Sequence, residues 1–396
     1  MTAVLLIGSR DGALAAAERL GLDVYLVSET KPLRQRRPRL AGLCVTSFEQ
    51  RRPAFIQTVA SAFPNLFEAG AAPRAIAALT ERSVIPAAWL REQLQVRGND
   101  VDVAARCRDK LHMKEHAKKY GVPCADFSPI DARTTPVQLA KRLGLPLVLK
   151  PRDASGARGT TFVRALSDIP TRLGSNLMAE SLVHGLEMSV ETLIVDGDVR
   201  FVNLTEYLLP LWANVVPAAL LPEAERQVRA LNLELVRSLG VQRGMTHVEL
   251  FLTTSGPVFS EIALRPPGGL LMRLLQESYG FDPWEAVLRC ELGEPVELPQ
   301  SSEAYSGVWF IHPGPGRVTR LQGLGVAERV AGVEEINCRA RVGDEISARG
   351  GSGESTGHVL ARGATRAEVV GSLERARRSI VIELEALSAR RRVARS

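Results

Sequence analysis

Two glutamates and an arginine lie close together in one short segment of the chain. Glu249 and Glu261 are twelve positions apart in the run MTHVELFLTTSGPVFSEIALRPPGG, and Arg265 follows the second glutamate by four residues. Apolar and polar residues alternate on both sides of a central Ser-Gly-Pro stretch, which predicts a β-hairpin. Carboxylates and a guanidinium on one hairpin can bind a cation and an oxyanion side by side.

The predicted turn brings the two glutamates together. A five-residue turn at 253–257, centred on Ser255, pairs residue 251 with residue 259 and places Glu249 opposite Glu261. Like charges directly opposite each other destabilise a sheet, and a hard cation such as Mg²⁺ removes that cost by binding both carboxylates. We therefore interpret the pair as metal ligands. The alternative is two charges on a solvated face of the hairpin.

A second segment has the composition of a phosphate-binding loop. Lys150 follows the apolar run LPLVL, so it stands where a buried strand meets a loop and can offer a point charge to a phosphate oxygen. The loop 153–159 (DASGARG) can cap phosphates with backbone N–H groups, because its glycines permit close approach. It lacks the Walker pattern. Its candidate donors are Ser155, Gly156, Arg158 and Gly159.

Length and composition fit a chain of two to three domains with ordinary cores. The 396 residues are 45% hydrophobic and 24% charged, with a net charge of +6. Basic residues cluster at 31–39 and at Arg390, Arg391, Arg392 and Arg395, which we interpret as a solvated loop and a frayed tail. With only 5% aromatic residues, we expect no nucleic-acid partner.

Cysteine usage and hydropathy indicate a reducing compartment and no membrane. The five cysteines are scattered and form no C-x-x-C pair, which argues against a disulfide framework and a zinc site. No signal peptide and no run of 18 apolar residues is found, so we expect a cytoplasmic location and no membrane partner.

The chain resembles the ATP-grasp superfamily, and more closely its L-amino acid ligases, the carboxylate–amine ligases that form dipeptides in antibiotic pathways. Four segments match in the family's order: 108–123 (RDKLHMKEHAKKYGVP), 147–163 (LVLKPRDASGARGTTFV), 178–191 (MAESLVHGLEMSVE) and 261–269 (EIALRPPGG). The resemblance implies an α/β ATP-grasp fold with a Rossmann-like N-terminal domain, a mobile lid subdomain and a small C-terminal α+β domain.

Patterning and resemblance together divide the chain into four parts. Residues 1–105 are the N-terminal α/β domain, whose Gly8 and Gly12 we interpret as a tight strand-to-helix turn and not a dinucleotide fingerprint. Residues 106–180 hold a helix capped by Asp109 and a small βαβ-like lid. Residues 181–300 form the central domain with the metal and substrate site, and 301–396 form the domain that closes over it. Apolar periodicity predicts helices at 10–20, 223–239, 283–292 and 367–387.

The resemblance also assigns roles around the nucleotide. Lys110 matches the first ATP-contacting lysine of the family, and Lys150 is the second and a catalytic residue. The segment Glu180, Ser181, Leu182 and Val183 is implied to be the hinge whose backbone pairs with adenine. Glu187 would accept hydrogen bonds from the ribose hydroxyls, and Glu191, on the same strand face, would reach the phosphates or a metal.

By the same resemblance, Glu249 and Glu261 hold one or two Mg²⁺ ions, for which Mn²⁺ can substitute, against the ATP phosphates. Arg265 would hold the substrate carboxylate and then the acylphosphate oxyanion. Many relatives carry Asn two residues after the second glutamate, where this chain has Ala263. We expect a water molecule to fill that position; weaker metal binding or loss of turnover are the alternatives.

The implied reaction is ATP-dependent amide formation. A carboxylate of an amino acid or related small acid becomes an acylphosphate, and an amine displaces the phosphate. Substrate contacts are expected from His247, from the helix-start glycines Gly268 and Gly269, and from Arg273, with Trp212 and Asn214 nearby. The alternatives are a biotin carboxylase-like or formate-using enzyme, or a non-catalytic ATP-binding regulatory protein. A homodimer is the default assembly.

Overall fold

The computed structural model describes residues 2–32, 40–170, 172–351 and 353–387. Most of the basic run 31–39 and the tail arginines therefore lie outside the described residues. Among the described helices, none is both long and apolar enough to cross a membrane. The five cysteines are free thiols.

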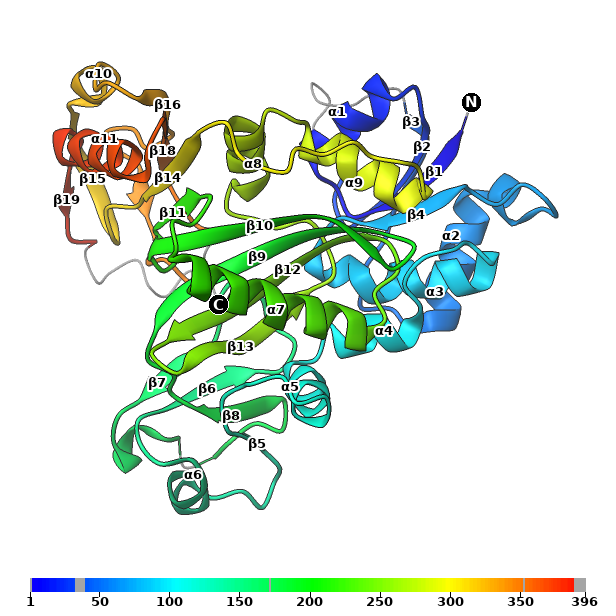
Figure 1. Ribbon diagram of the computed structural model, residues 1–396, viewed down its shortest axis with the longest axis horizontal. Coiled ribbons are helices and arrows are strands. Elements are labelled where there is room, and N and C mark those ends of the chain that lie inside the picture. Colours follow the sequence, from blue (N-terminus) through cyan, green and yellow to red (C-terminus); the bar gives the residue numbers. More distant parts are fainter. Residues whose placement is uncertain (1, 33–39, 171, 352, 388–396) are drawn as a thin grey trace.

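A four-stranded parallel sheet with strand order β3-β2-β1-β4 forms the N-terminal part (Figure 1). Its strands are apolar and largely buried, as expected for a parallel sheet covered by helices. The predicted turn after β1 is confirmed, with Gly8 at φ 88°. The elements are β1 (Ala3–Ile7), α1 (Asp11–Arg19), β2 (Asp23–Ser28), β3 (Leu40–Val45), α2 (Arg52–Ala62), β4 (Ala75–Ala78), α3 (Val84–Leu94) and α4 (Val101–Arg106).

Helix α5 (Lys110–Lys119) leads from this sheet into the lid subdomain. Its N-cap is Asp109, whose carboxylate accepts from the N–H of Leu111, as predicted. The lid elements are β5 (Phe127–Pro129), α6 (Pro136–Leu143), β6 (Leu147–Pro151), β7 (Thr161–Val163) and β8 (Leu177–Ser181). Their order is β5-β8-β6-β7, so the βαβ-like unit predicted here is split: β8 lies antiparallel between β5 and β6.

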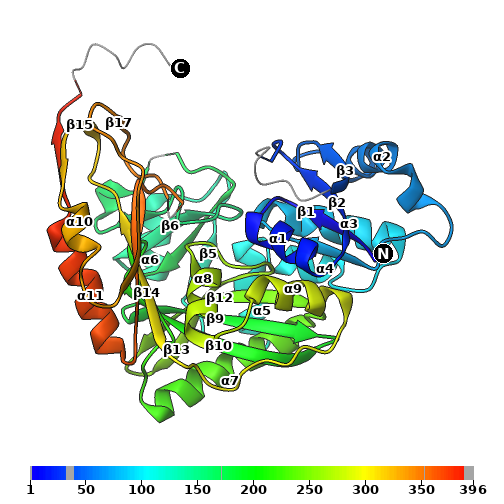
Figure 2. The same ribbon diagram turned by 90° about the horizontal axis from the view of Figure 1, so that it is seen from above.

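An eight-stranded sheet, ordered β13-β12-β9-β10-β11-β14-β18-β16, runs through the rest of the molecule. It continues across residue 300, because β11 pairs with β14. Figures 1 and 2 show α7 on one side of its central strands and α9 on the other. Its strands up to residue 300 are β9 (Leu186–Val195), β10 (Asp198–Leu209), β11 (Ala213–Val216), β12 (Gly244–Thr253) and β13 (Gly256–Ala263), with helices α7 (Pro222–Leu239), α8 (Leu271–Tyr279) and α9 (Pro283–Leu292).

The C-terminal part adds strands to this sheet and a small sheet of its own, ordered β17-β15-β19. Its elements are β14 (Tyr305–Ile311), β15 (Gly316–Gln322), α10 (Leu324–Ala327), β16 (Val333–Cys338), β17 (Glu345–Ile346), β18 (Gly357–Gly363), α11 (Arg366–Ser379) and β19 (Val381–Glu385). The helix predicted for 367–387 is too long. It ends at Ser379, and the alternation of exposed Val381 and Glu383 with inward Ile382 and Leu384 makes the remainder a strand.

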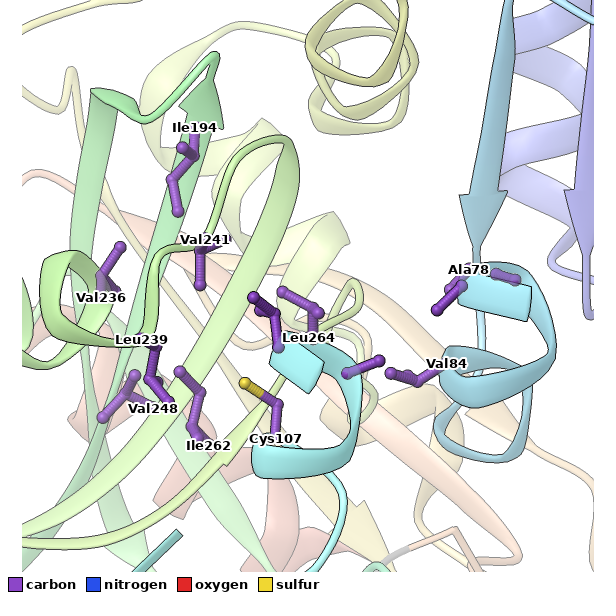
Figure 3. Packing of buried hydrophobic residues seen from close by; sticks show 14 of the residues in the cluster. Ala78, Val84, Cys107, Ile194, Val236, Leu239, Val241, Val248, Ile262 and Leu264 are labelled. Atoms are coloured by element: carbon purple, nitrogen blue, oxygen red, sulfur yellow. The ribbon is translucent and has the colours of Figure 1, made fainter. Parts of the chain in front are cut away.

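One hydrophobic core joins the N-terminal part to the central sheet. Figure 3 shows Ala78 and Val84 of the N-terminal part on one side of Leu264, and the buried thiol of Cys107 on the other side, pointing toward Ile262. Val248 and Ile262 on the hairpin and Leu239 on α7 complete the opposite side of the same cluster. The two parts therefore exclude water together, which fixes their relative position.

Candidate active site

A cavity of about 470 Å³ lies between the lid subdomain and the central sheet. Its walls come from β6 and β8 of the lid, from the loop 154–157, and from β9, β10, β12 and β13 of the central sheet. Most of the predicted site residues line it: Lys150, Ser155, Gly156, Glu180, Ser181, Leu182, Val183, Glu187, His247, Glu249, Glu261, Arg265, Gly268 and Gly269.

The glutamates Glu249 and Glu261 are direct cross-strand partners, as predicted. The turn that joins their strands is shorter than predicted: Thr253 pairs with Gly256, and Phe251 pairs with Val258 instead of residue 259. A β-bulge between Glu249 and Leu250 takes up the difference, because Ser260 is left without a partner residue on β12. The tight turn and the bulge each shift the register by one residue in opposite directions, and the carboxylates still meet.

Lysines surround these carboxylates and the entrance of the loop 153–159. Lys110 Nζ lies 3.0 Å from Glu261 Oε2 and donates to the backbone oxygen of Ala154 at 2.5 Å. Lys150 Nζ lies 2.6 Å from Glu180 Oε1. Burial lowers the pKa of Lys150, but the charges of Glu180 and Glu261 outweigh it and raise the pKa above its usual value. Lys150 therefore stays cationic beside the loop.

A third lysine, Lys114, was missed by the sequence interpretation. Its ammonium group is fully buried, donates to the backbone oxygen of Phe259 at 3.0 Å and lies 3.2 Å from Glu180 Oε2. Burial lowers the pKa of Lys114. The sequence does contain a pattern that could have identified Lys114. Its helical spacing places it on one buried face of α5, together with Lys110, Met113 and Ala117.

Residues 180–183 border the cavity together with apolar side chains. Ala125, Val148, Phe162 and Leu182 supply an apolar lining there, which suits a flat purine ring. Glu180 contributes its side chain as well as its backbone, because that carboxylate bridges the two buried lysines. The sequence interpretation had used only its backbone.

The loop 153–159 contributes unequally to the cavity. Ser155 and Gly156 line it, whereas Arg158 and Gly159 are not among the described lining residues. The C-terminal part touches the same loop: a Cβ on Gly351 would lie 3.0 Å from the backbone oxygen of Gly156. Gly351 thus allows the C-terminal part to approach the loop closely.

Glu187 faces the cavity, where burial and the negative charges of Glu249 and Glu261 raise its pKa to about 7. Three carboxylates thus share this space, an excess of negative charge that a divalent cation would offset. Within the described residues, no set of three His, Cys, Asp or Glu side chains is placed to hold a metal ion by itself. Glu249 and Glu261 fit a metal that is also held by a ligand such as a phosphate.

Glu191 does not reach the cavity, contrary to the sequence interpretation. Its buried carboxylate accepts hydrogen bonds from Ser189, Asn203 and Thr205 and lies 2.9 Å from His247 Nδ1. It is enclosed by its cross-strand neighbours, Asn203 on β10 and His247 on β12, which both contact the carboxylate. Its role is to fix His247.

His247 connects this buried network to the metal-ligand pair. Its Nε2 lies 3.5 Å from Glu249 Oε1, so both ring nitrogens face carboxylates. Burial lowers the pKa of His247. The hydrogen bonds with Glu191 and Glu249 and the negative charges of these two carboxylates outweigh burial and raise the pKa to about 9. Burial would raise the pKa of Glu249, yet the hydrogen bond with His247 holds it low. Glu249 also accepts from Tyr207 Oη at 3.2 Å, a contact that the sequence interpretation missed.

Arg265 lines the cavity and contacts the N-terminal part of the chain. Its Nε is 3.0 Å from Glu81 Oε2, and Glu81 belongs to that part. Gly268, Gly269 and Asn214 also line the cavity. Arg273, predicted to contact substrate, instead pairs with Glu277 one turn along α8 and is half-exposed. Trp212 stacks under the guanidinium of Arg349, 4.3 Å from the ring centre.

Comparisons with known proteins agree with this geometry. Residues 115–269 match the ATP-grasp domain family, and residues 308–385 match L-amino acid ligase C-terminal domain 2. The chain is 26% identical over 307 residues to the L-arginine-specific L-amino acid ligase of Bacillus subtilis, spanning 72% of this chain and 73% of that protein. It is 31% identical over 191 residues to the D-alanine–D-alanine ligase of Cupriavidus necator, spanning 43% of this chain and 58% of that protein.

Solved structures show the same fold over nearly the whole chain. The L-amino acid ligase of Bacillus licheniformis superposes with a TM-score of 0.81 at 20% identity, covering 97% of this chain and 99% of that one. Carboxyaminoimidazole ribonucleotide synthase from Aspergillus clavatus, solved with ATP, gives a TM-score of 0.76 at 21% identity, with coverage of 96% and 98%.

The fold and the cavity define an ATP-grasp ligase, an enzyme class that uses ATP. The chain contains an ATP-grasp domain and is similar to the L-amino acid ligases over most of its length, including the C-terminal part.

Proposed function

We propose that this enzyme activates the carboxylate of an amino acid or related small acid as an acylphosphate and joins it to an amine. ATP phosphorylates the carboxylate and leaves as ADP. The amine nitrogen then bonds to the acyl carbon, the C–O bond to phosphate breaks, and the amine proton is released. The products are an amide or peptide bond, ADP and inorganic phosphate.

One observation carries this proposal: a single cavity joins an apolar slot, the cations Lys150 and Arg265 and two opposed carboxylates, and Lys110 Nζ lies 3.0 Å from one of these carboxylates, that of Glu261. We assign adenine to the apolar slot beside Leu182 and the phosphates to Lys110, Lys150 and the backbone of Ser155 and Gly156. The charge on the transferred phosphoryl group would then lie next to fixed cations, which is the main source of catalysis in phosphoryl transfer.

Glu249 and Glu261 would hold Mg²⁺ together with the nucleotide phosphates. The bound ion would neutralise phosphate charge and orient the γ-phosphoryl group. The chain's own residues prepare that site before a metal arrives: His247 and Tyr207 hold the carboxylate of Glu249 in place, and Lys110 holds that of Glu261. The remaining cation, Arg265, would bind the carboxylate to be activated and the oxyanion that develops from it.

The test is Mg²⁺-dependent phosphate release from ATP over pairs drawn from the amino acids and simple amines. A productive pair gives phosphate together with a product whose mass equals the sum of the substrates minus water. Glu261→Gln should abolish both signals. Glu297→Gln, a change well outside the cavity, is the matched control and should preserve them.

Silence over the whole panel, with ATP still binding, would contradict the proposal. It would favour the alternative of an ATP-binding regulatory protein, for which Ala263 in place of the usual asparagine is the only sign in the site. Bicarbonate-dependent phosphate release without amide product would instead favour a carboxylating enzyme.

A further inference from the structure

A second cavity of about 470 Å³ lies in the C-terminal part, next to the active-site cavity. Its walls come from the end of β10, from β14 and the residues just after it, from the end of α11 and from β19. Protein interiors have few voids larger than a water molecule, whereas ligand sites measure about 300–1,000 Å³. The size of this second cavity therefore suits a small molecule.

Aromatic side chains form much of its lining. Trp212, Trp309 and Phe310 all line the second cavity. The rings of Trp212 and His312 meet edge to face, with their centres 6.4 Å apart and their planes at 79°. Aromatic rings offer large apolar faces and slightly positive edges to a partner ring. The lining can therefore hold a flat apolar molecule.

The charge of the lining is positive. Arg377 and Arg378 of α11 line the second cavity, and none of its described lining residues is acidic. The guanidinium of Arg377 stacks on the ring of Trp309, 4.6 Å from its centre, a position from which its N–H groups can bind a carboxylate. Arg378 is paired at 3.3 Å with Glu374, but both side chains are exposed, so this pair holds it weakly. An anionic group is thus favoured here.

His312 adds a hydrogen-bond donor to the lining. The backbone N–H of Gly314 donates to His312 Nδ1 at 3.2 Å. Burial and the positive charge of Arg349 lower the pKa of His312, so its ring is neutral at neutral pH. Because Nδ1 accepts, the proton of the neutral ring lies on Nε2, which can donate to an anion.

The second cavity shares a wall with the active site. Phe310 lines both cavities, and its N–H donates to the backbone oxygen of Trp212 at 2.8 Å. Of residues 209–212, the first and last line the second cavity, and the middle two line the active-site cavity. Leu211, one of the middle two, has φ 68°, a strained conformation for a leucine. A ligand that displaces Trp212 or Phe310 would therefore displace the active-site wall.

A further connection runs from Trp212 to the phosphate-binding loop. The guanidinium of Arg349 lies 4.3 Å from the ring centre of Trp212 and donates to the backbone oxygen of Leu211 at 2.5 Å. Two residues later, Gly351 packs against the backbone of Gly156 in the loop 153–159. A shift of Trp212 would thus reach the residues to which we assign the ATP phosphates.

We propose that the second cavity is an effector site: it binds a small molecule that joins a flat apolar ring to an anionic group, and the bound molecule changes the affinity of the active site for ATP. The binding site does not depend on the proposed ligase function, whereas its effect requires ATP to bind as proposed above. By linkage, ATP changes the affinity for the effector by the same factor.

The first experiment measures binding while the active-site cavity is filled. The fluorescent anion 8-anilinonaphthalene-1-sulfonate joins aromatic rings to a sulfonate and brightens in apolar sites. It is titrated into the full chain with saturating ATP and Mg²⁺, where we expect one bound probe per chain. Indole-3-acetate, the neutral indole-3-acetamide and the cationic tryptamine then compete with it. Because only the first is an anion, it should displace the probe at about tenfold lower concentration than the other two.

Variants locate the bound probe. Leu209→Trp places a larger side chain on the wall at an exposed position and should weaken probe binding about tenfold. Leu221→Trp, also exposed but outside both cavities, is the matched control. The double variant Arg377→Gln, Arg378→Gln should lose the preference for indole-3-acetate. Arg375→Gln, on the same helix but outside the cavity, should keep it.

The second experiment measures the effect on the active site. ATP is titrated into wild type and into Leu209→Trp by calorimetry, with and without indole-3-acetate. In wild type we expect indole-3-acetate to change the Kd for ATP about fivefold or more. In Leu209→Trp the change should disappear, whereas competition within the adenine slot would persist in that variant.

The binding site is refuted if the probe does not bind in the presence of ATP, if the three indoles compete equally, or if Leu209→Trp keeps wild-type affinity for the probe. The effector role is refuted if indole-3-acetate leaves the Kd for ATP unchanged, or changes it equally in both proteins. If ATP itself does not bind, the proposed function fails instead, and indole competition without ATP still tests the second cavity.

Discussion

The carboxylate of Glu180 bridges the ammonium groups of Lys114 and Lys150, at 3.2 Å from the first and 2.6 Å from the second. All three groups are buried. The bridge ties helix α5 to strands β6 and β8, so it fixes the lid subdomain against the cavity. A buried charge of this kind depends on its partners, because an unpaired one is strongly destabilising.

Replacing Glu180 by Gln should lower the free energy of unfolding by about 3 kcal/mol at neutral pH, because two buried ammonium groups lose their partner. Burial raises the pKa of Glu180, but the two lysines outweigh it and hold the pKa below the usual 4.5. The stabilisation is therefore present above about pH 4.5 and is lost as the pH falls through the lower folded-state pKa.

Urea unfolding of wild type and Glu180→Gln, from neutral pH to about pH 3, measures this effect. The difference between the two proteins should shrink toward the acid end. The exposed Glu223→Gln, which removes the surface partner of Arg226, is the control and should leave the neutral-pH midpoint unchanged. A pH-independent difference for Glu180→Gln would refute the charge-pair explanation.

Changing Arg265 to Lys should lower kcat on the order of 100-fold, because an ammonium cannot present the paired donors that an oxyanion and Glu81 both use. Steady-state kinetics with the substrate pair from the phosphate-release panel measures the loss. Arg226→Lys, on the exposed face of α7, should have wild-type kinetics. A kcat within threefold of wild type would show that Arg265 only neutralises charge.

Introducing asparagine at position 263 should tighten metal binding. Ala263 pairs with His247 across β12 and β13 and lines the cavity, so an amide oxygen there would point toward the metal-ligand carboxylates. We expect the Mg²⁺ concentration for half-maximal phosphate release to fall about threefold or more. Ala263→Val, which adds volume without an oxygen, should not lower it. An unchanged Mg²⁺ requirement in Ala263→Asn would mean that position 263 is not beside the ion.

Replacing Tyr207 by Phe should weaken metal binding, because the phenol hydroxyl helps to orient Glu249. Loss of such an outer contact costs about tenfold in metal affinity. The Mg²⁺ dependence of ATP binding, followed by calorimetry, tests this without turnover. Tyr120→Phe, which changes a half-exposed phenol on the end of α5, should bind metal as wild type does. Equal affinities for Tyr207→Phe and wild type would leave His247 as the sole support of Glu249.

The hairpin shows what sequence periodicity can predict. The opposition of Glu249 and Glu261, predicted from alternation and from a turn centred on Ser255, is confirmed. The turn and the register between the two glutamates were predicted wrongly, because a two-residue turn and a bulge at Ser260 replace the predicted five-residue turn. Alternation reports which side chains share a face, but a bulge shows no signature until the neighbouring strand is known.

Contacts between residues far apart in the sequence were harder to predict. Glu81 and Arg108 carry no local pattern that points to Arg265, because the contact depends on how the N-terminal sheet docks on the central one. Glu191 was placed on the correct strand face, yet its burial depends on strands on both sides of β9. In both cases tertiary packing determined the outcome.

The continuous eight-stranded sheet has a consequence for dissecting the protein. Strand β11 (Ala213–Val216) is hydrogen-bonded to β10 on one side and to β14, beyond residue 300, on the other. A fragment cut at residue 300 would leave β11, whose four residues are buried, as an edge strand without its partner β14. Such an edge pairs readily with another chain, so the ATP-grasp core expressed alone should self-associate.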